Sequence, residues 1–259
     1  MTEHIPRHRS PLPLLMVWAA MLAACMPPPP PPTPTATTAP TLTATPTIVW
    51  FPPTSTPTRQ VTVTPAPTEE LRPGVGSLIL ADDFSNGEEW SLVETASTSA
   101  AVVNNHLTLV LNRANSFLYT TRRSPLLGDF YAEITAVPKL CAAGDEYGLM
   151  ARVKDFQNYF RLTITCSGSV GVDRMLKGIF NPIIPKERVL FLPAGVPSEQ
   201  RLGVWASGQE VRFFINGNFI YSIKDNVFGR GTLGVFVRTA GDAGVSADFR
   251  DLSIWEIRK

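Results

Sequence analysis

The chain has 259 residues, with 23 lysines and arginines against 22 aspartates and glutamates, for a formal net charge of +1. This balance excludes the strongly basic surface on which nucleic-acid binding depends, so no nucleic-acid partner is expected. The three cysteines and three histidines form no cluster with the spacing of zinc ligands, and no glycine-rich phosphate loop is present. We therefore expect neither a zinc site nor a phosphate-binding loop.

The first 24 residues have the pattern of a secretory signal. Arg7 and Arg9 precede an apolar run, residues 12–24, which is shorter than the roughly 20 residues that a membrane-spanning helix needs. Residues 22–25, Leu-Ala-Ala-Cys, resemble a bacterial lipobox, which implies cleavage before Cys25 and a lipid on its thiol. An ordinary cleaved signal and an uncleaved anchor remain alternatives. The lipobox predicts an extracytoplasmic lipoprotein, anchored to the cell membrane or cell surface through Cys25.

Residues 25–76 form a predicted linker rich in proline and threonine. Residues 27–32 are all proline, and Thr-Pro pairs follow, including Thr33-Pro34 and Thr45-Pro46. Proline fixes φ and lacks an N–H donor, so we expect a disordered, extended stalk and neither helix nor sheet. Threonines among prolines are typical of O-glycosylated stalks as well as of plain spacers, and both interpretations stay open.

Residues 77–259 are predicted to form one domain. Short runs with period-2 alternation follow one another, and no long segment has helical periodicity. The clearest runs are residues 107–111, 130–134, 159–165, 210–215, 219–223, 231–237 and 245–257. Asn216-Gly217 lies between two of them and predicts a type I′ hairpin turn. About a dozen strands with hairpin links predict an all-β fold, a two-sheet antiparallel jelly-roll sandwich.

Several segments resemble one known group of domains. They are residues 80–85 followed by Trp90, residues 147–152, 158–162, 211–217, 231–235 and 247–255. In this order they are similar to concanavalin A-like lectin/glucanase domains of bacterial surface lipoproteins, related to laminin-G-like modules and to 3-keto-disaccharide hydrolase domains. The resemblance implies a jelly roll and, in many members, glycan binding, but a fold alone does not fix a function.

The sequence offers few residues in the arrangements that known catalytic sites use. Glucanases of this group use Glu-x-Asp-x-x-Glu on one strand, and the sequence lacks that motif. Once the signal is removed, His106 is the remaining histidine, and its Asn104-Asn105 neighbours predict a turn entering a strand. The leading hypothesis is therefore a non-enzymatic, lipid-anchored cell-surface module that binds carbohydrate. The alternatives are a glycoside-acting enzyme of the keto-disaccharide hydrolase type and a structural or protein-interaction domain.

Two further sets of residues have a functional and a structural interpretation. Asp82-Asp83 and Asp145-Glu146 could contribute to calcium sites, or could form a strand edge and a solvated turn. No other cofactor is expected. Three tryptophans could stack on sugars or fill the core, namely Trp90, Trp205 and Trp255.

A disulfide between Cys141 and Cys166 is predicted. The lipid occupies Cys25, and export leaves the other two cysteines in an oxidising space. They lie near the far ends of a predicted hairpin, residues 145–154 with 157–166, where facing strands bring them together. Two free buried thiols are the alternative.

The same hairpin supplies the predicted binding face. Alternation directs one set of side chains into the core, namely Leu149, Ala151, Val153, Phe160, Leu162 and Ile164. The opposite set is Met150, Arg152, Tyr159, Arg161 and Thr163. Of these, Arg152, Tyr159 and Arg161 are the candidate ligand-binding residues, because guanidinium forks and aromatic rings are typical of sugar recognition. Alternatively, the arginines pair with acidic residues of adjacent strands.

Overall fold

The computed structural model describes residues 70–241 and 244–258, all within one compact unit, Thr64–Lys259. The predicted signal, Cys25 and the linker up to residue 69 lie outside the described residues. The described part contains fifteen strands, and all of its strand pairs are antiparallel. No helix in this part of the chain is long and apolar enough to cross a membrane.

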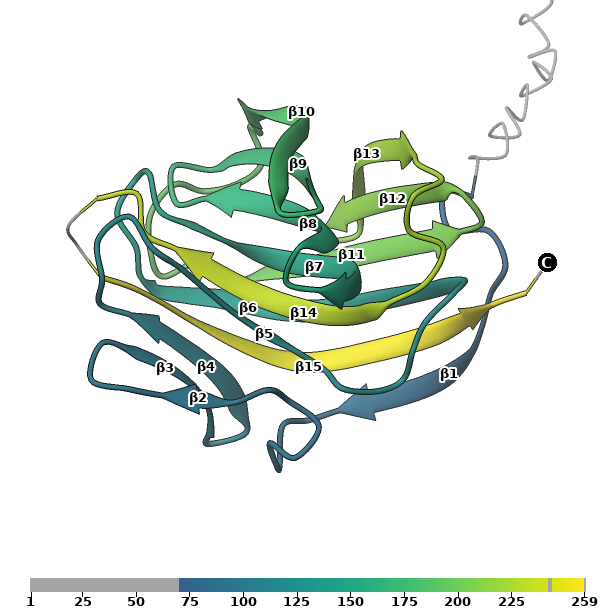
Figure 1. Cartoon of the computed structure of the whole chain (residues 1–259). Coiled ribbons are helices and arrows are strands. Elements are labelled where there is room, and N and C mark those ends of the chain that lie inside the picture. Colours follow the sequence, from purple (N-terminus) through teal and green to yellow (C-terminus); the bar gives the residue numbers. More distant parts are fainter. Residues whose placement is uncertain (1–69, 242–243, 259) are drawn as a thin grey trace, which may run out of the picture. The chain divides into compact units, whose positions relative to one another are not determined.

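The strands form two sheets packed face to face (Figure 1), so the predicted all-β antiparallel sandwich is confirmed. One sheet has nine strands, in the order β13-β12-β11-β6-β15-β4-β3-β2, with β1 also paired to β15. Its strands are β1 (Val75–Asp82), β2 (Val93–Glu94), β3 (Thr98–Val103), β4 (His106–Leu111), β6 (Phe130–Leu140), β11 (Gln200–Ser207), β12 (Glu210–Ile215), β13 (Asn218–Lys224) and β15 (Val245–Ile257).

The other sheet has six strands, in the order β10-β9-β8-β7-β14-β5. They are β5 (Phe117–Thr121), β7 (Glu146–Asp155), β8 (Asn158–Thr165), β9 (Ser169–Leu176), β10 (Ile179–Arg188) and β14 (Thr232–Arg238). Across the core, β14 lies next to β4 and β15 of the nine-stranded sheet (Figure 1). The outer face of the six-stranded sheet is called the six-strand face below, and that of the other sheet the nine-strand face.

The core forms where alternating apolar side chains of both sheets meet. Leu107, Leu109 and Leu111 on β4 are fully buried, as are Phe160, Leu162 and Ile164 on β8. Each alternate residue of β4 is only half-buried, which is the period-2 pattern of a strand with one face in the core. Burial of such side chains stabilises the fold by about 1.5–3 kcal/mol each.

The chain ends of the domain meet along the long strand β15. Its first half pairs with β4 and its second half with β1, after a register shift near Asp251, whose φ is 55°. The Arg258 amide donates to the Gly74 carbonyl at 2.7 Å. The first and last strands of the described part therefore lie side by side.

The predicted hairpins form. β12 and β13 are joined by Asn216 and Gly217, which have φ angles of 54° and 77°. Both lie in the left-handed region that a type I′ turn demands, and that region favours asparagine and glycine. The hairpin of β7 and β8 also forms, pairing Leu149 with Leu162.

A bulge in β7 changes the direction of two side chains, and here the predicted alternation was wrong. Arg152 has a φ of 49°, and the pairing with β8 shifts register after Ala151. Because the bulge adds one residue, Arg152 lies fully buried, where its guanidinium donates to the carbonyls of Phe228 and Gly208. Val153 lies on the outer side instead, packed with Met150 and Tyr159.

The Cys141–Cys166 disulfide is present, with the two Cα atoms 5.9 Å apart. Cys141 follows β6 of the nine-stranded sheet, and Cys166 follows β8 of the six-stranded sheet. The bridge therefore fastens the connection through which the chain passes from one sheet to the other. A disulfide of this kind is typical of proteins that fold in an oxidising, extracytoplasmic space.

Candidate functional site

The six-strand face carries a group of charged residues at its centre, which we call the ion-pair cluster. Its members are Glu146, Arg161, Asp173, Lys186 and Arg238. Register places them together: Arg161 is directly opposite Asp173 on β8 and β9, and Arg238 is opposite Glu146 on β14 and β7. Opposite charges at such cross-strand positions attract, so the sheet itself assembles the cluster.

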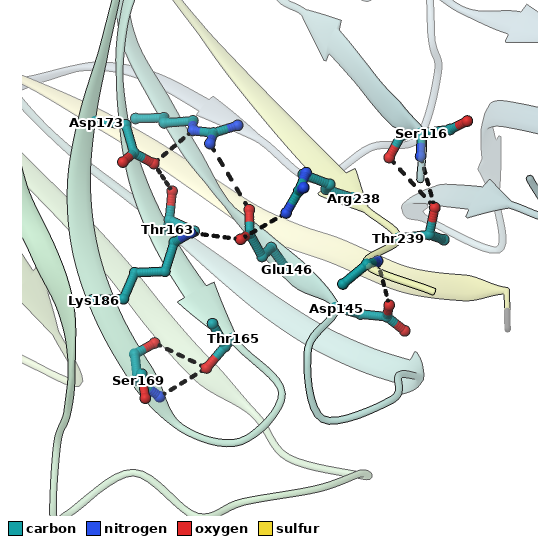
Figure 2. Close-up of polar contacts among 12 residues, drawn as sticks. Ser116, Asp145, Glu146, Thr163, Thr165, Ser169, Asp173, Lys186, Arg238 and Thr239 are labelled. Carbon is teal, nitrogen blue, oxygen red and sulfur yellow. Dashed lines mark hydrogen bonds and ion pairs between the residues drawn. The ribbon is translucent and has the colours of Figure 1, made fainter. Parts of the chain in front are cut away.

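Glu146 accepts hydrogen bonds from two partly exposed cations, Lys186 and Arg238, which are called the rim cations below. Its Oε1 atom accepts from Lys186 Nζ at 2.6 Å and from Arg238 Nη1 at 3.0 Å, as Figure 2 shows. The Glu146 side chain is 3% exposed, whereas those of Lys186 and Arg238 are 30% and 40% exposed. Glu146 thus holds the two cationic heads in place while both remain accessible to solvent.

Arg161 is fixed on every side. Its Nε donates to Asp173 Oδ2 at 2.8 Å, and the same oxygen accepts from the Thr163 hydroxyl at 2.7 Å (Figure 2 labels Thr163 and Asp173). Its guanidinium lies over the rings of Phe180 and Phe236, both 5.0 Å from the ring centroid, and over Phe117 at 5.5 Å. Cation–π contacts and a buried ion pair together leave this side chain a single orientation.

A hollow of about 380 Å³ lies beside the cluster on the six-strand face. It is lined by Phe117, Tyr159, Arg161, Met175, Phe180, Lys186 and Arg238. Three of these residues are cations and none is acidic. The volume lies in the range of small-ligand sites, and a mixture of aromatic rings with a few fixed polar groups is typical of them.

The glycine at position 148 leaves room for an aromatic ring on the six-strand face, that of Phe236. Gly148 lies opposite Thr163 on β8 and Phe236 on β14. A Cβ atom there would lie 1.9 Å from the Leu162 carbonyl oxygen and 2.9 Å from the Phe236 ring. Only a residue without a side chain leaves room there for the Phe236 ring, over which Arg161 lies.

The three predicted ligand-binding residues separate into two groups. Tyr159 and Arg161 line the hollow, as the alternation of β8 predicts, and burial raises the pKa of the Tyr159 hydroxyl. Arg161 also makes the ion pairs that the alternative interpretation predicted. Arg152 is not on this face: burial lowers its pKa, while Asp129 and Asp225 act in the opposite direction. Its bonds to backbone carbonyls make it part of the interior.

The nine-strand face also carries aromatic rings, but the chain itself covers them. Residues 70–74, called the entry segment below, lie across Tyr131, Trp205, Phe214 and Trp255. Trp205 Nε1 donates to the Pro73 carbonyl at 3.0 Å, and Arg72 lies over the rings of Tyr131 and Phe214 at 5.5 and 5.4 Å. These rings therefore already have contacts on the side that a sugar would use.

Two hollows flank this covered cluster, of about 520 and 440 Å³, and both are lined by Arg72 and Glu133. They are larger than the hollow of the six-strand face. Their linings, however, mix both signs of charge, because Arg201 is accompanied by Glu199 in one and Glu70 lines the other. The six-strand face is the better candidate because its lining presents the exposed ring of Phe180 and a single sign of charge.

The other residues singled out from the sequence have structural surroundings. Trp90 is 1% exposed, packs on Phe84 in the core and donates its indole N–H to Asp82 at 3.0 Å. Trp205 and Trp255 belong to the covered cluster of the nine-strand face. His106 begins β4 after a turn in which Asn104 and Asn105 have positive φ, and its ring bonds to the Asn104 carbonyl, as the turn interpretation predicts.

The two acidic pairs considered for calcium are occupied by N–H donors. Asp82 accepts from Trp90 and Arg122, while Asp83 accepts from the Ser85 amide. Asp145 accepts from the amides of Ala142 and Ala240, which pins the turn beside the disulfide. No group of three or more potential metal ligands occurs among residues 70–241 and 244–258.

Two carboxylates on one face are the arrangement that a glycosidase needs. Glu146 and Asp173 share the six-strand face, yet both are buried and neither lines the hollow. Arg161 lies between them, with its Nη2 3.8 Å from Glu146 Oε2. In this arrangement the two carboxylates pair with cations and do not line the hollow.

Several residues of the site were missed in the sequence, namely Phe117, Glu146 in its pairing role, Asp173, Phe180, Lys186 and Arg238. Asp173 alternates with Gly171 and Met175 on β9, so the period-2 rule could have placed it. Lys186 could not be placed in this way because β10 contains Pro182 and Pro185 and reads as a loop. Prolines are tolerated there because β10 is an edge strand.

Comparisons with known proteins agree on the fold. No family model and no curated protein matches the chain. Among solved structures, a protein of unknown function with a galectin-like fold from Bacillus subtilis matches with a TM-score of 0.53 and 13% identity, over 71% of this chain and 99% of that one. A glycosidic hydrolase matches with a TM-score of 0.50 and 14% identity, over 70% and 96%. The carbohydrate binding module CBM66 from Bacillus subtilis has a TM-score of 0.48 and 18% identity, over 65% and 96%.

At these identities the likeness shows the fold alone. The domain is a galectin- or concanavalin A-like β-sandwich, as the segments quoted from the sequence predicted.

Proposed function

We propose that this protein is a cell-surface module that binds carbohydrate in the hollow of the six-strand face. The observation that carries the proposal is the hollow's lining, which combines the exposed ring of Phe180 with cationic donors held in fixed positions. Aromatic rings stack on the apolar faces of sugars, and guanidinium and ammonium groups donate to their oxygens. The glycosidic hydrolase of similar fold supports a saccharide as the ligand.

The proposed attachment to the cell rests on the sequence. The signal before Cys25, the lipobox and the proline-rich linker support an extracytoplasmic lipoprotein whose binding domain is carried on a stalk. The disulfide agrees with an oxidising location. In this arrangement the partners are the membrane, through the lipid on Cys25, and a glycan or polysaccharide. Radiolabelled fatty acid should be incorporated by the native chain and not by Cys25→Ser; equal labelling of both excludes the anchor.

The binding proposal is tested on a glycan array with the full chain in a mild detergent, with and without calcium. The decisive variant is Phe180→Ala, because Phe180 lines the hollow and is 47% exposed, so its removal leaves the core intact. We expect its affinity for any glycan bound by the native chain to fall about tenfold, the effect of losing one stacked ring.

Phe156→Ala is the matched control. Phe156 is also an exposed phenylalanine of the six-stranded sheet, in the turn between β7 and β8, but it does not line the hollow. If both changes leave the affinity unaltered, the hollow is not the site. If no glycan binds at all, the carbohydrate proposal itself is wrong.

A further inference from the structure

The charge of the hollow differs from that of the two larger hollows on the nine-strand face. Its lining includes Arg161, Lys186 and Arg238 and no acidic residue. The two hollows of the nine-strand face include Glu133 together with Glu199 or Glu70. The charged groups that a ligand meets in the hollow of the six-strand face are therefore all cations.

The ion-pair cluster does not neutralise this charge. It contains three cations against the two carboxylates of Glu146 and Asp173, which leaves one positive charge in excess. The distribution matters more than the sum, because both carboxylates are 2% exposed and lie beneath the cations. The accessible layer is positive and the buried layer is negative.

The two rim cations retain unused donors. Lys186 gives one N–H to Glu146, and an ammonium group has three. Arg238 gives one N–H from Nη1 to the same oxygen, and a guanidinium group has five. Because both heads converge on a single Glu146 oxygen, their remaining donors lie near one another at the open side of the hollow.

We propose that the saccharide recognised here is acidic, a sugar whose carboxylate, as in a uronic acid, is bound by Lys186 and Arg238 while its ring contacts Phe180 and Tyr159. This inference rests on the proposed function, since it names the ligand class of that same hollow. A carboxylate is the natural partner for a guanidinium fork beside an ammonium group. The preformed bonds to Glu146 hold both cations in position before the ligand arrives, so little side-chain freedom is lost on binding.

The test compares acidic polysaccharides with their carboxyl-reduced, neutral counterparts, using pectate, alginate and hyaluronan against the full chain by biolayer interferometry. We expect at least one acidic polymer to bind ten or more times tighter than its reduced counterpart. A tenfold ratio of affinities is the order of magnitude that one charged hydrogen bond contributes. This preference should shrink between about 50 mM and 500 mM salt, because screening weakens exposed charge pairs.

The decisive variant is the double change Lys186→Met/Arg238→Gln, which should abolish the preference, so that the acidic polymer binds no tighter than its reduced counterpart. A single cooperative urea-unfolding transition, followed by tryptophan fluorescence, shows that the variant is folded. The conservative variant Arg238→Lys keeps the charge but loses the fork, and it should keep part of the preference.

The matched control is Lys139→Met/Arg201→Gln, which removes the same charge from the nine-strand face. There, Lys139 pairs with Asp248 and Arg201 with Glu133, at 3.5 and 3.6 Å. The control should retain the full preference. A preference lost in the control and kept in the decisive variant assigns the site to the other face and overturns the inference.

The remaining outcomes are also decisive. Equal binding of acidic and reduced polymers, or binding of neutral glycans alone, overturns the inference and leaves the proposed carbohydrate function standing. Absence of binding to every polymer and to the glycan array overturns the proposed function, and the inference falls with it.

Discussion

The two outer faces of the sandwich carry similar side chains, but these side chains are covered to different degrees. On the six-strand face, Arg161 lies over the rings of Phe117, Phe180 and Phe236, and the hollow beside it is open. On the nine-strand face, Arg72 lies over Tyr131 and Phe214, but Arg72 belongs to the entry segment that covers those rings. Arginine on aromatic rings borders an open hollow in one place and holds a covering segment of the chain in the other.

The difference lies in what anchors each arginine. Arg161 comes from the middle of β8 and is held by the buried carboxylate of Asp173. Arg72 precedes β1, is about one-third exposed, and is 4.0 Å from Glu133. A residue of a central strand is fixed by both neighbouring strands, whereas a residue outside the sheet is fixed only by what it touches.

The largest expected effect is that of Arg161→Met. It leaves Asp173 and Glu146 without their shared cation in a buried setting, and we expect a loss of about 3–5 kcal/mol in the free energy of unfolding. Urea denaturation followed by tryptophan fluorescence measures it. Arg72→Met should cost far less, and equal costs for the two variants would remove the distinction between the faces.

The disulfide couples the two sheets and should have the next largest effect. Cys141→Ser/Cys166→Ser removes the link across 25 residues of sequence, for an expected cost of about 3–4 kcal/mol in unfolding free energy. Reductant should shift the urea midpoint of the native chain toward that of the variant and leave the variant unchanged. A midpoint of the native chain that reductant does not move, with both thiols shown to be reduced, contradicts the prediction.

Alkaline pH separates the two faces through their tyrosines. Burial raises the pKa of Tyr131 and of Tyr159 above the ordinary 10.0, and the hydrogen bond to Glu133 raises that of Tyr131 further. The unfolded chain therefore loses these protons first, so stability falls as the pH rises above about 10, by up to about 1.4 kcal/mol per pH unit for each tyrosine.

Tyr131→Phe and Tyr159→Phe should each reduce this slope, with the larger reduction for Tyr131. Urea midpoints between pH 9 and pH 11 measure it. The chain with both tyrosines changed should show the smallest slope, and an unchanged slope in all three variants contradicts the assignment of the shifts to these phenols.

The smallest expected effect concerns the entry segment. Arg72→Gln removes the contacts with Tyr131 and Phe214 and should cost about 1 kcal/mol. The loss should be local, so thermolysin should cleave near Leu71 several times faster while the global unfolding midpoint moves little. The matched change Arg212→Gln removes the bond to the Leu71 carbonyl and should give the same pattern.

Much of the fold followed from period-2 patterns. The alternation in β4 and β8 and the Asn216-Gly217 turn identified strands and hairpins because local chemistry decides them. The disulfide could be predicted because Cys141 and Cys166 flank one hairpin in the sequence. The fold family could be recognised because its segments occur in order along the chain.

The site could be predicted only within one hairpin. Tyr159 and Arg161 were placed correctly because β8 alternates without interruption. Arg152 was misplaced because a positive φ and one extra residue reverse the alternation, and an arginine gives no local sign of either. Lys186, Arg238 and Asp173 come from three other strands, so their meeting depends on strand order, which periodicity does not encode.

The hydrogen bond from Arg258 to Gly74 makes the domain nearly a closed loop. A molecule built in this way can be grafted into a surface loop of a host protein, because the two junctions are neighbours at one end of the β1–β15 strand pair. New chain ends could be opened at the Asn216-Gly217 turn after joining the old ones. In either design the hollow of the six-strand face stays clear of the junctions.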